Sequence, residues 1–344
     1  MSLKNDLTKL LQRVATGAKT FSDTELKLFS DLETKEIREI LPLWNEIPLN
    51  RQENFLQELY DFYAKDSLVV YENLGLVMME DKSPSIRAKG LALLGENDNA
   101  RFGTKVAAIA ANDPDETVRV EALTQLGRYV LLDQLESLSG SWDLAKAEAI
   151  LRAATHDPNG QIARVGLENY AYFENPEVSN LIEKAFDNPE AAWQESAIIA
   201  AGRSEDMQWM GNIIAGLSHP NSNVRRSAAT ALGENGVHAS RVQLLEALEE
   251  EDDPDVFNSI FWALSMIGGE DVRTTLEAAM ADCEDDDQLE FMENAMENLS
   301  MIEELGHFDM LGFEPSELDD LTIEDFDLDN ELDVLPTDNK KKKK

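Results

Sequence analysis

Residues that bind metals or form disulfides are scarce in this sequence. It has one cysteine, Cys283, and only four histidines. Zinc sites draw on several Cys or His side chains held close together, so we expect no metal ion and no other cofactor. A single cysteine cannot form a disulfide within the chain, which is typical of a reducing, cytoplasmic environment.

Basic residues are also few. The 344 residues include 30 Lys or Arg against 68 Asp or Glu, for a formal net charge of −38. Nucleic-acid binding needs Lys and Arg to displace counterions from phosphates, and an anionic membrane surface would repel this chain. The longest apolar runs stop well short of the roughly 20 residues of a membrane-spanning helix. The composition thus disfavours nucleic acid and membrane as partners and favours a basic protein or peptide.

The familiar catalytic motifs are missing as well. The sequence has no glycine-rich phosphate loop, no Gly-x-Ser-x-Gly nucleophile turn and no His-Glu-x-x-His. Two acidic runs, 249–253 and 284–287, lack the glycine and the final glutamate that a calcium loop needs at fixed positions. We expect no catalytic residues and interpret the chain as a non-enzyme.

What the sequence does contain is one spacing that recurs between residues 81 and 268. A polar residue followed in most copies by Pro leads to a β-branched residue at +5, Arg at +6, Ala at +9 and Leu-Gly at +13 and +14. The two clearest copies start at Asp113-Pro114 and His219-Pro220. Weaker copies start at Asp81, Asp157, Asn188 and Asp253.

Each position in the copy has a structural interpretation. Asp at the start would cap a helix, with Pro at its first position, where a missing N–H does no harm. Positions +5, +9, +12 and +13 share one helix face, and the Gly at +14 would end the helix in a left-handed turn. A second apolar stripe follows each Gly. Every copy therefore predicts a helical hairpin.

The spacing between copies indicates how the hairpins are arranged. The closing glycines Gly95 and Gly127, Gly202 and Gly233, and Gly233 and Gly268 are 32, 31 and 35 residues apart. Paired helices with such a period are typical of a stacked α-solenoid. Over residues 66–282 the skeleton resembles short HEAT-type repeats of the kind also found in phycobilin lyase subunits. The resemblance implies an all-α fold, a right-handed ARM/HEAT-like superhelix of stacked helical hairpins with helical caps.

The rest of the chain is assigned around these repeats. Residues 1–65 are expected to form a helical N-terminal cap, with a capping box at Ser22 and Glu25 and a helix near Thr34 to Trp44. Residues 66–282 are the HEAT-like repeats, and 283–304 a C-terminal capping helix. Residues 129–155 depart from the pattern and predict two short helices where one is expected.

Residues 305–344 form an acidic tail that ends in a run of lysines. From 305 to 339 it has 12 Asp or Glu and no Lys or Arg, with apolar residues between them. Such a composition cannot close a core, so we expect disorder. Leu318, Leu321 and Phe326 could form a short helix that docks on a partner or on the solenoid itself; the alternative is a tail that only confers solubility.

Three arginines at the +6 position, Arg87, Arg119 and Arg225, allow two interpretations. They could form an exposed basic ladder, or they could pair with acidic residues in the loops of adjacent copies. Because Arg and carboxylates form strong two-point hydrogen bonds, we favour the pairing.

Four aromatic residues do not fit the repeat pattern. Trp209 lies about 100° away from the apolar stripe of its helix, and Tyr170, Tyr172 and Phe173 cluster where the repeat has Leu-Gly. Either they form an exposed contact patch or they fill irregular packing beside the insertion. They are the candidate protein-binding residues of the repeat region.

These observations favour a non-enzymatic scaffold or adaptor. Its second helices would line an acidic concave surface that binds a basic protein or peptide. HEAT-type hydroxylases carry repeated His-Glu pairs as iron ligands, and no histidine here is followed by Glu. The resemblance to bilin lyase subunits implies an alternative, a chromophore lyase-like or complex-assembly factor, which would need a hydrophobic concave pocket with a positive group.

Overall fold

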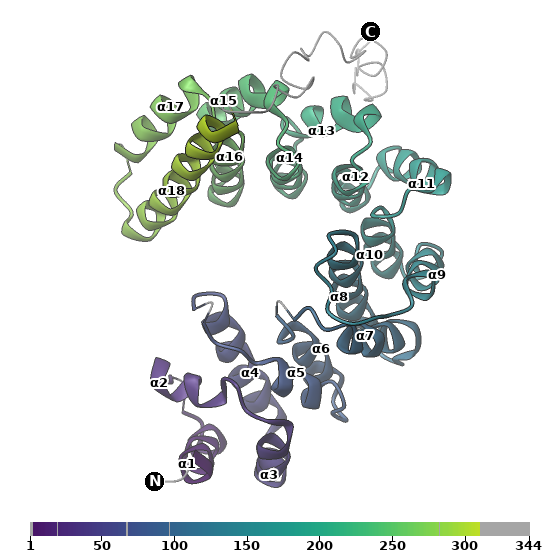
Figure 1. The fold of residues 1–344 in the computed structure, drawn as a ribbon, viewed down its shortest axis with the longest axis vertical. Helices are drawn as coiled ribbons and strands as arrows, with labels where there is room; N and C mark the ends of the chain where they lie inside the picture. Colours follow the sequence, from purple (N-terminus) through teal and green to yellow (C-terminus); the bar gives the residue numbers. More distant parts are fainter. Residues whose placement is uncertain (1–2, 19, 67, 96, 282, 310–344) are drawn as a thin grey trace, which may run out of the picture. The chain divides into compact units, whose positions relative to one another are not determined.

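The computed structural model describes residues 3–18, 20–66, 68–95, 97–281 and 283–309 (Figure 1). These residues form eighteen α-helices and three short 3-10 helices, and their single β-type contact is an isolated bridge between Asn99 and Ser139. The predicted all-α class is confirmed. Among the described helices, none combines the length and apolar composition needed to cross a bilayer. The chain divides into two compact units, Met1–Tyr172 and Phe173–Lys344.

The first unit begins with four helices that surround an aromatic cluster. Phe55 lies at its centre, with ring centroids 5.2 Å from Phe29 and 5.1 Å from Phe21, both edge-to-face. The capping box is confirmed, since the Ser22 backbone N–H donates to Glu25 Oε2 at 2.9 Å. The helices of this unit are α1 (Leu3–Thr16), α2 (Asp23–Leu26), α3 (Thr34–Trp44), α4 (Leu49–Tyr63), α5 (Glu72–Met78), α6 (Pro84–Ala92), α7 (Ala100–Asn112), α8 (Glu116–Gln134), α9 (Leu144–Ala154) and α10 (Gly160–Tyr170).

In the irregular region of the first unit, residues 129–155, the second of the two predicted short helices is present as α9 (Leu144–Ala154), whereas the first is the end of α8 and not a separate helix. Helix α8 continues to Gln134, and the insertion is a loop that folds back on the start of α7. There Ser139 N–H donates to the Asp98 carbonyl at 2.8 Å and its carbonyl accepts from Ala100 N–H at 2.9 Å. Trp142 Nε1 donates to Asp133 Oδ1 at 2.9 Å. These bonds hold the loop between the end of α8 and the start of α9 in place.

The second unit consists of helical hairpins. The second helices of the hairpins, α12, α14, α16 and α18, pack against one another in succession, and α11, α13, α15 and α17 form the other layer (Figure 1). The stacked-hairpin prediction is therefore confirmed within this unit. The helices are α11 (Pro176–Phe186), α12 (Ala191–Ser204), α13 (Met210–Gly216), α14 (Ser222–Glu234), α15 (Arg241–Glu250), α16 (Pro254–Ile267), α17 (Glu270–Ala281) and α18 (Asp286–Asp309).

The predicted helix starts are wrong by two residues in most copies. Helix α8 is capped by Asp115, whose Oδ1 accepts from Thr117 N–H at 3.0 Å, and not by Asp113. Asp113 instead accepts from the Asp115 N–H at 2.9 Å, so it closes the turn before the helix. The Asp253-Pro254 pair does cap and open α16, because that copy starts at Glu251.

The residue that starts each copy has one constant task, which is to accept a hydrogen bond from the backbone N–H two residues later. Six side chains do so at 2.8 to 3.0 Å, and they are Asp81, Asp113, Asp157, Asn188, His219 and Glu251. The residue types differ, but each offers an acceptor atom. What the six copies have in common at this position is therefore the hydrogen bond and not a charge.

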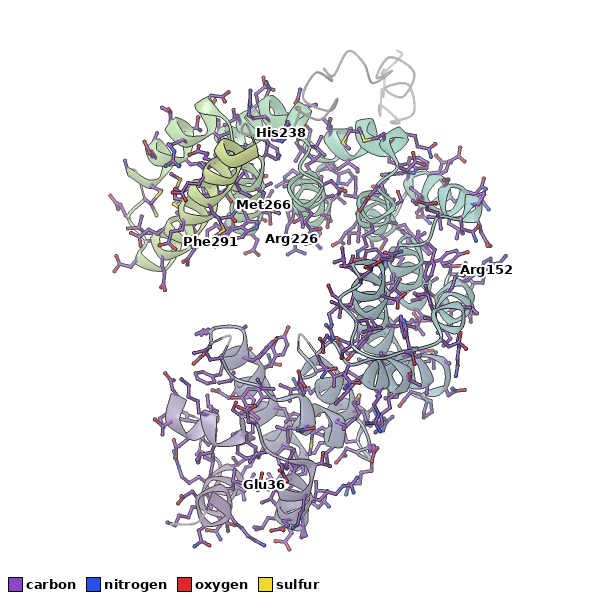
Figure 2. All side chains as sticks on the ribbon, in the orientation of Figure 1. Glu36, Arg152, Arg226, His238, Met266 and Phe291 are labelled. Carbon is purple, nitrogen blue, oxygen red and sulfur yellow. The ribbon has the colours of Figure 1, made fainter. Side chains whose placement is uncertain are left out.

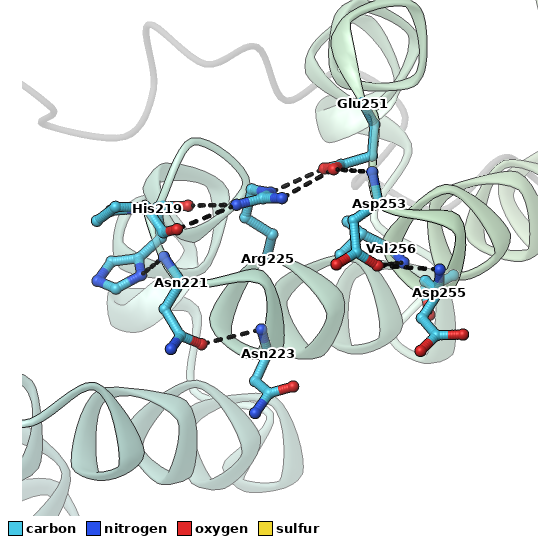
Figure 3. Close-up of polar contacts among 10 residues, drawn as sticks. His219, Asn221, Asn223, Arg225, Glu251, Asp253, Asp255 and Val256 are labelled. Carbon is cyan, nitrogen blue, oxygen red and sulfur yellow. Dashed lines mark hydrogen bonds and ion pairs between the residues drawn. The ribbon is translucent and has the colours of Figure 1, made fainter.

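The arginines at +6 connect one copy to the next, as the pairing interpretation predicted. Arg87 donates to both carboxylate oxygens of Asp113, at 2.7 and 2.8 Å, and to the Asp81 carbonyl at 3.1 Å. Arg225 repeats this arrangement with both oxygens of Glu251, each at 2.8 Å, and with the His219 carbonyl at 2.9 Å (Figure 3). The arginine thus holds its own turn and the starting residue of the next copy together.

Two of the closing glycines have the positive φ of the predicted turn, although Gly268, with ψ of −171°, does not adopt the left-handed helical conformation. Gly95 has φ of +55° and Gly268 has φ of +71°, in the region where a side chain is strained. Gly127, Gly202 and Gly233 instead lie inside helices, so their assignment as helix terminators is wrong.

The interior glycines allow close approach of helices. A Cβ built on Gly233 would lie 2.7 Å from Ala263 Cα, and one on Gly202 would lie 2.9 Å from Ala231 Cβ. Carbon atoms that are not bonded to each other do not approach to such distances in proteins. The glycine at this position therefore lets successive second helices touch backbone to backbone.

His219 makes one repeat junction sensitive to pH. Its Nδ1 accepts from Asn221 N–H at 3.0 Å and its Nε2 lies 2.9 Å from Gln194 Oε1, which requires a neutral ring. Burial lowers the pKa of His219, and the charge of Arg225 adds to this effect. The unfolded chain therefore protonates His219 more readily than the folded chain does. The stability contributed by neutral His219 is present above its unfolded pKa and is lost as the pH falls from that value through the lower pKa of the folded state.

We expect His219→Asn to reduce the loss of stability on acidification. Asn188 fills the same position in another copy, so the turn can keep its acceptor. Urea unfolding of the full chain, followed by tryptophan fluorescence at about pH 7.5 and pH 5.5, measures the effect. Wild type should lose more stability between the two pH values than His219→Asn does, and equal losses would contradict the role of this ring.

Candidate functional site

The aromatic residues singled out in the sequence are mainly packing residues. Trp209 is only 8% exposed and its ring centroid lies 5.8 Å from that of Phe186, while Tyr170 is fully buried. For these two the exposed-patch interpretation is wrong and the packing alternative holds, because both side chains are buried. Tyr172 and Phe173 are half-buried. Tyr170 and Tyr172 belong to the first unit, and Phe173 and Trp209 to the second.

Three candidate residues of the tail, Leu318, Leu321 and Phe326, lie outside the described residues. The expected docking helix there stays a prediction.

The second unit carries a groove that the sequence did not reveal, here called the aromatic groove. It has a volume of about 280 Å³ and lies between α14, α16 and α18. Figure 2 shows Met266 and Phe291 on the side of these helices turned away from α13 and α15. The groove is lined by Thr230, Glu234, Asn258, Ser259, Trp262, Ala263, Met266 and Phe291.

Two rings dominate the aromatic groove. Trp262 is 39% exposed, and its ring centroid lies 6.2 Å from that of Phe291 at an interplanar angle of 44°. Phe291 in turn lies 6.4 Å from Phe261, which is fully buried. The exposed indole is therefore held in place by a chain of ring contacts that ends in the core.

Two of the polar side chains of the groove, Thr230 and Ser259, present acceptor atoms, whereas Asn258, whose Oδ1 accepts from Gln288 Nε2, presents its amide N–H donors. The Thr230 hydroxyl donates to the Arg226 carbonyl at 3.0 Å, and the Ser259 hydroxyl donates to the Asp255 carbonyl at 3.1 Å. Both hydroxyl hydrogens are engaged within the helices, so each oxygen can take part in a further hydrogen bond only as an acceptor. The Thr230 and Ser259 hydroxyls are thus suited to a ligand that donates hydrogen bonds.

Glu234 is the charged residue in the lining of the aromatic groove. The residue as a whole is exposed. Protein atoms around its carboxyl group nevertheless raise the pKa of Glu234 by burial, an effect that the charge of Arg203 partly offsets. A carboxylate in such surroundings gains more from a nearby cation than one in open water.

A second groove, here called the methionine groove, lies along the last described hairpin. It has a volume of about 570 Å³, and its one lining residue from α17 is Met280. Met301 is 61% exposed beside it. The α18 residues that line it are Glu293, Met296, Glu297, Ser300, Met301 and Glu304.

The surroundings of the methionine groove are strongly acidic. Residues 270–309 contain fourteen carboxylates and a single Lys or Arg, Arg273. Arg273 Nη2 lies 2.5 Å from Glu303 Oε2 and its Nη1 lies 3.8 Å from Glu277, contacts that raise the pKa of Arg273. The single basic side chain of this segment is therefore already paired with carboxylates of its own helix and of α18.

The side chains that line the two grooves do not form a cluster that could hold a metal ion. Across the part of the chain that the structure describes, no three Asp, Glu, His or Cys side chains come together in a way that could hold a metal ion.

The fold and the grooves can now be compared with known proteins. Residues 210–291 match the family model of HEAT repeats. Residues 210–291 are HEAT repeats. In HEAT proteins helix pairs stack into a solenoid, as the hairpins from α13 to α17 do. The aromatic groove lies entirely within the matched repeats, whereas the methionine groove extends beyond them along α18.

Solved structures similar to this HEAT-repeat protein share little sequence with it. E. coli YibA is 16% identical, with a TM-score of 0.37 over 87% of this chain and 95% of its own. Human deoxyhypusine hydroxylase in complex with glycerol is 16% identical, with a TM-score of 0.35 over 87% and 97%. Kap121p bound to Nup53p is 14% identical, with a TM-score of 0.35 over 89% and 35%. No curated protein matches the sequence.

Proposed function

We propose that this HEAT-repeat protein is a non-enzymatic scaffold that binds a basic segment of another protein. The observation that carries the proposal is the methionine groove, where three methionines are accompanied by three glutamates. The carboxylates concerned lie along α18 and not in the aromatic groove, which has Glu234 alone.

The chemistry of the methionine groove suits a basic amphipathic helix. Methionine side chains are flexible and polarizable, so they can accommodate the apolar stripe of many different helices. Lys and Arg beside that stripe would meet Glu293, Glu297 and Glu304. Charge complementarity of this kind speeds association and makes it sensitive to salt.

The chromophore-lyase alternative has less support. The propionates of a bilin would need positive partners, and no Lys or Arg lines either of the described grooves.

The test uses the full chain and a defined probe, a fluorescein-labelled 18-residue helix with leucines on one stripe and Lys and Arg elsewhere. We expect binding in the micromolar range at about 50 mM salt and a loss of about tenfold at about 300 mM. A matched peptide with Glu in place of Lys and Arg should not bind. Equal binding of the two peptides would contradict the proposal.

A matched pair of variants locates the binding surface. Changing Glu293, Glu297 and Glu304 together to Gln should weaken binding about tenfold, because each lost pair contributes a few tenths of a kcal/mol. Changing Glu246, Glu249 and Glu250 on α15 to Gln alters the net charge equally and should change affinity less than about twofold. Equal effects would mean that the peptide responds only to the overall charge.

A further inference from the structure

The exposure of Trp262 is unusual for its place in the fold. On the same helix Phe261, Ala263 and Leu264 are fully buried or nearly so, whereas Trp262 is 39% exposed beside a groove. An indole left in water forgoes part of the free energy that its burial would contribute. An exposed aromatic ring at the edge of a groove is a common feature of binding sites.

The lining of the aromatic groove defines the chemistry of its ligand. The face of an indole attracts cations, and Glu234 offers a negative charge. Thr230 and Ser259 present acceptor oxygens. A ligand that fits all of these groups is a planar cation that carries several N–H donors and an apolar stem, which describes an arginine side chain.

We propose that the aromatic groove binds one arginine side chain of a protein partner, with the guanidinium stacked on Trp262 and paired with Glu234. Phe291 and Met266 pack against the methylene stem of that arginine. A lysine fits less well, since its ammonium cannot stack and has three donors instead of five.

The protein's own arginines do not occupy this position. Arg226, which Figure 2 places on the same face, lies two turns before Glu234, about 12 Å along the helix. Its Nη2 is 3.9 Å from Glu195 on α12. Neither Arg226 nor Arg203 lines the groove.

This inference stands apart from the proposed function. The two grooves share no lining residue, so an arginine peptide can bind the aromatic groove whether or not a basic helix binds the methionine groove.

The test observes Trp262 directly in the full chain labelled with 5-fluorotryptophan. Trp262→Phe identifies the fluorine NMR signal, and the protein is titrated with the capped tripeptides Gly-Arg-Gly, Gly-Lys-Gly and Gly-citrulline-Gly. We expect a saturable shift with Gly-Arg-Gly and a Kd in the millimolar range, since one cation–π contact and one ion pair contribute only a few kcal/mol. Gly-Lys-Gly should bind about threefold more weakly, and Gly-citrulline-Gly, which has the shape of arginine without its charge, should give no saturable shift.

Two variants complete the test. Glu234→Gln should weaken the arginine peptide about fivefold, and Glu246→Gln on α15 should leave its Kd unchanged. Three results would overturn the inference: no shift at about 50 mM Gly-Arg-Gly, equal binding of the citrulline peptide, or an unchanged Kd in Glu234→Gln. Equal binding of the citrulline peptide would indicate an apolar anchor site instead.

Discussion

Replacing Arg225 with Ala is expected to lower the free energy of unfolding of the second unit by about 3 kcal/mol. The guanidinium makes two hydrogen bonds to Glu251 and one to the His219 carbonyl, and the Glu251 side chain is only 6% exposed. Removal of the Arg225 guanidinium leaves the Glu251 carboxylate shielded from water and without its counter-charge. Glu251 also closes the turn before α16 through the Asp253 N–H, so the next hairpin loses support as well.

The neighbouring arginine provides the control for this experiment. Arg226 lies one residue further on α14, its side chain is 43% exposed, and it approaches Glu195 only to 3.9 Å. Arg226→Ala should change the stability by less than about 0.5 kcal/mol. Urea unfolding followed by tryptophan fluorescence measures both variants, because Trp193, Trp209 and Trp262 all lie in the second unit. Similar losses in the two variants would contradict a special role for the Arg225–Glu251 pair.

The second large effect is expected at Gly233, where alanine should cost about 3 kcal/mol. The added methyl group would meet the Cα atom of Ala263 at 2.7 Å, and backbone cannot rotate aside as a side chain does. Helices α14 and α16 would have to separate along their contact, with loss of packing on both sides. Thermal and urea unfolding of the full chain report the change.

Two further substitutions distinguish close approach from helix termination. Gly160→Ala, where nothing lies within 4 Å of the new Cβ, should be neutral or stabilise by about 0.5 kcal/mol. At position 233, asparagine should be worse than alanine because it is larger. If Gly233 ended its helix in a left-handed turn, asparagine would be the better tolerated of the two. The order of the two variants therefore decides between the explanations.

Much of the repeat could be predicted because its signals are local. The +5 and +9 positions, Val224 and Ala228 in one copy, are buried as the periodicity requires. The two-residue error at Asp113 arose because an acidic residue before a helix can either cap it or close the preceding turn, and only the neighbouring Asp115 decides which. The role of Gly233 depends on Ala263, which belongs to another copy and is not visible in the local sequence.

The two grooves could not be predicted for a related reason. Phe261 and Trp262 are adjacent in one apolar run, and a rotation of about 100° puts the first in the core and the second beside the aromatic groove. Met280 and Met296 come from different helices and meet only after the hairpin has formed. The three glutamates of the methionine groove all lie on α18, but the groove that they line is formed only when α17 and α18 come together.

The arginine junctions also bear on how such a chain can change in evolution. Arg87 and Asp113, and Arg225 and Glu251, are each 26 residues apart, so the first residue of every pair belongs to one copy and the second to the next. A duplication or deletion whose ends fall at equivalent positions in two copies would join an arginine to a suitable acceptor again. Arg119 and Asp157, which the insertion moves further apart in the sequence, still approach to 4.0 Å. Gain or loss of whole hairpins is therefore the change that this architecture tolerates best.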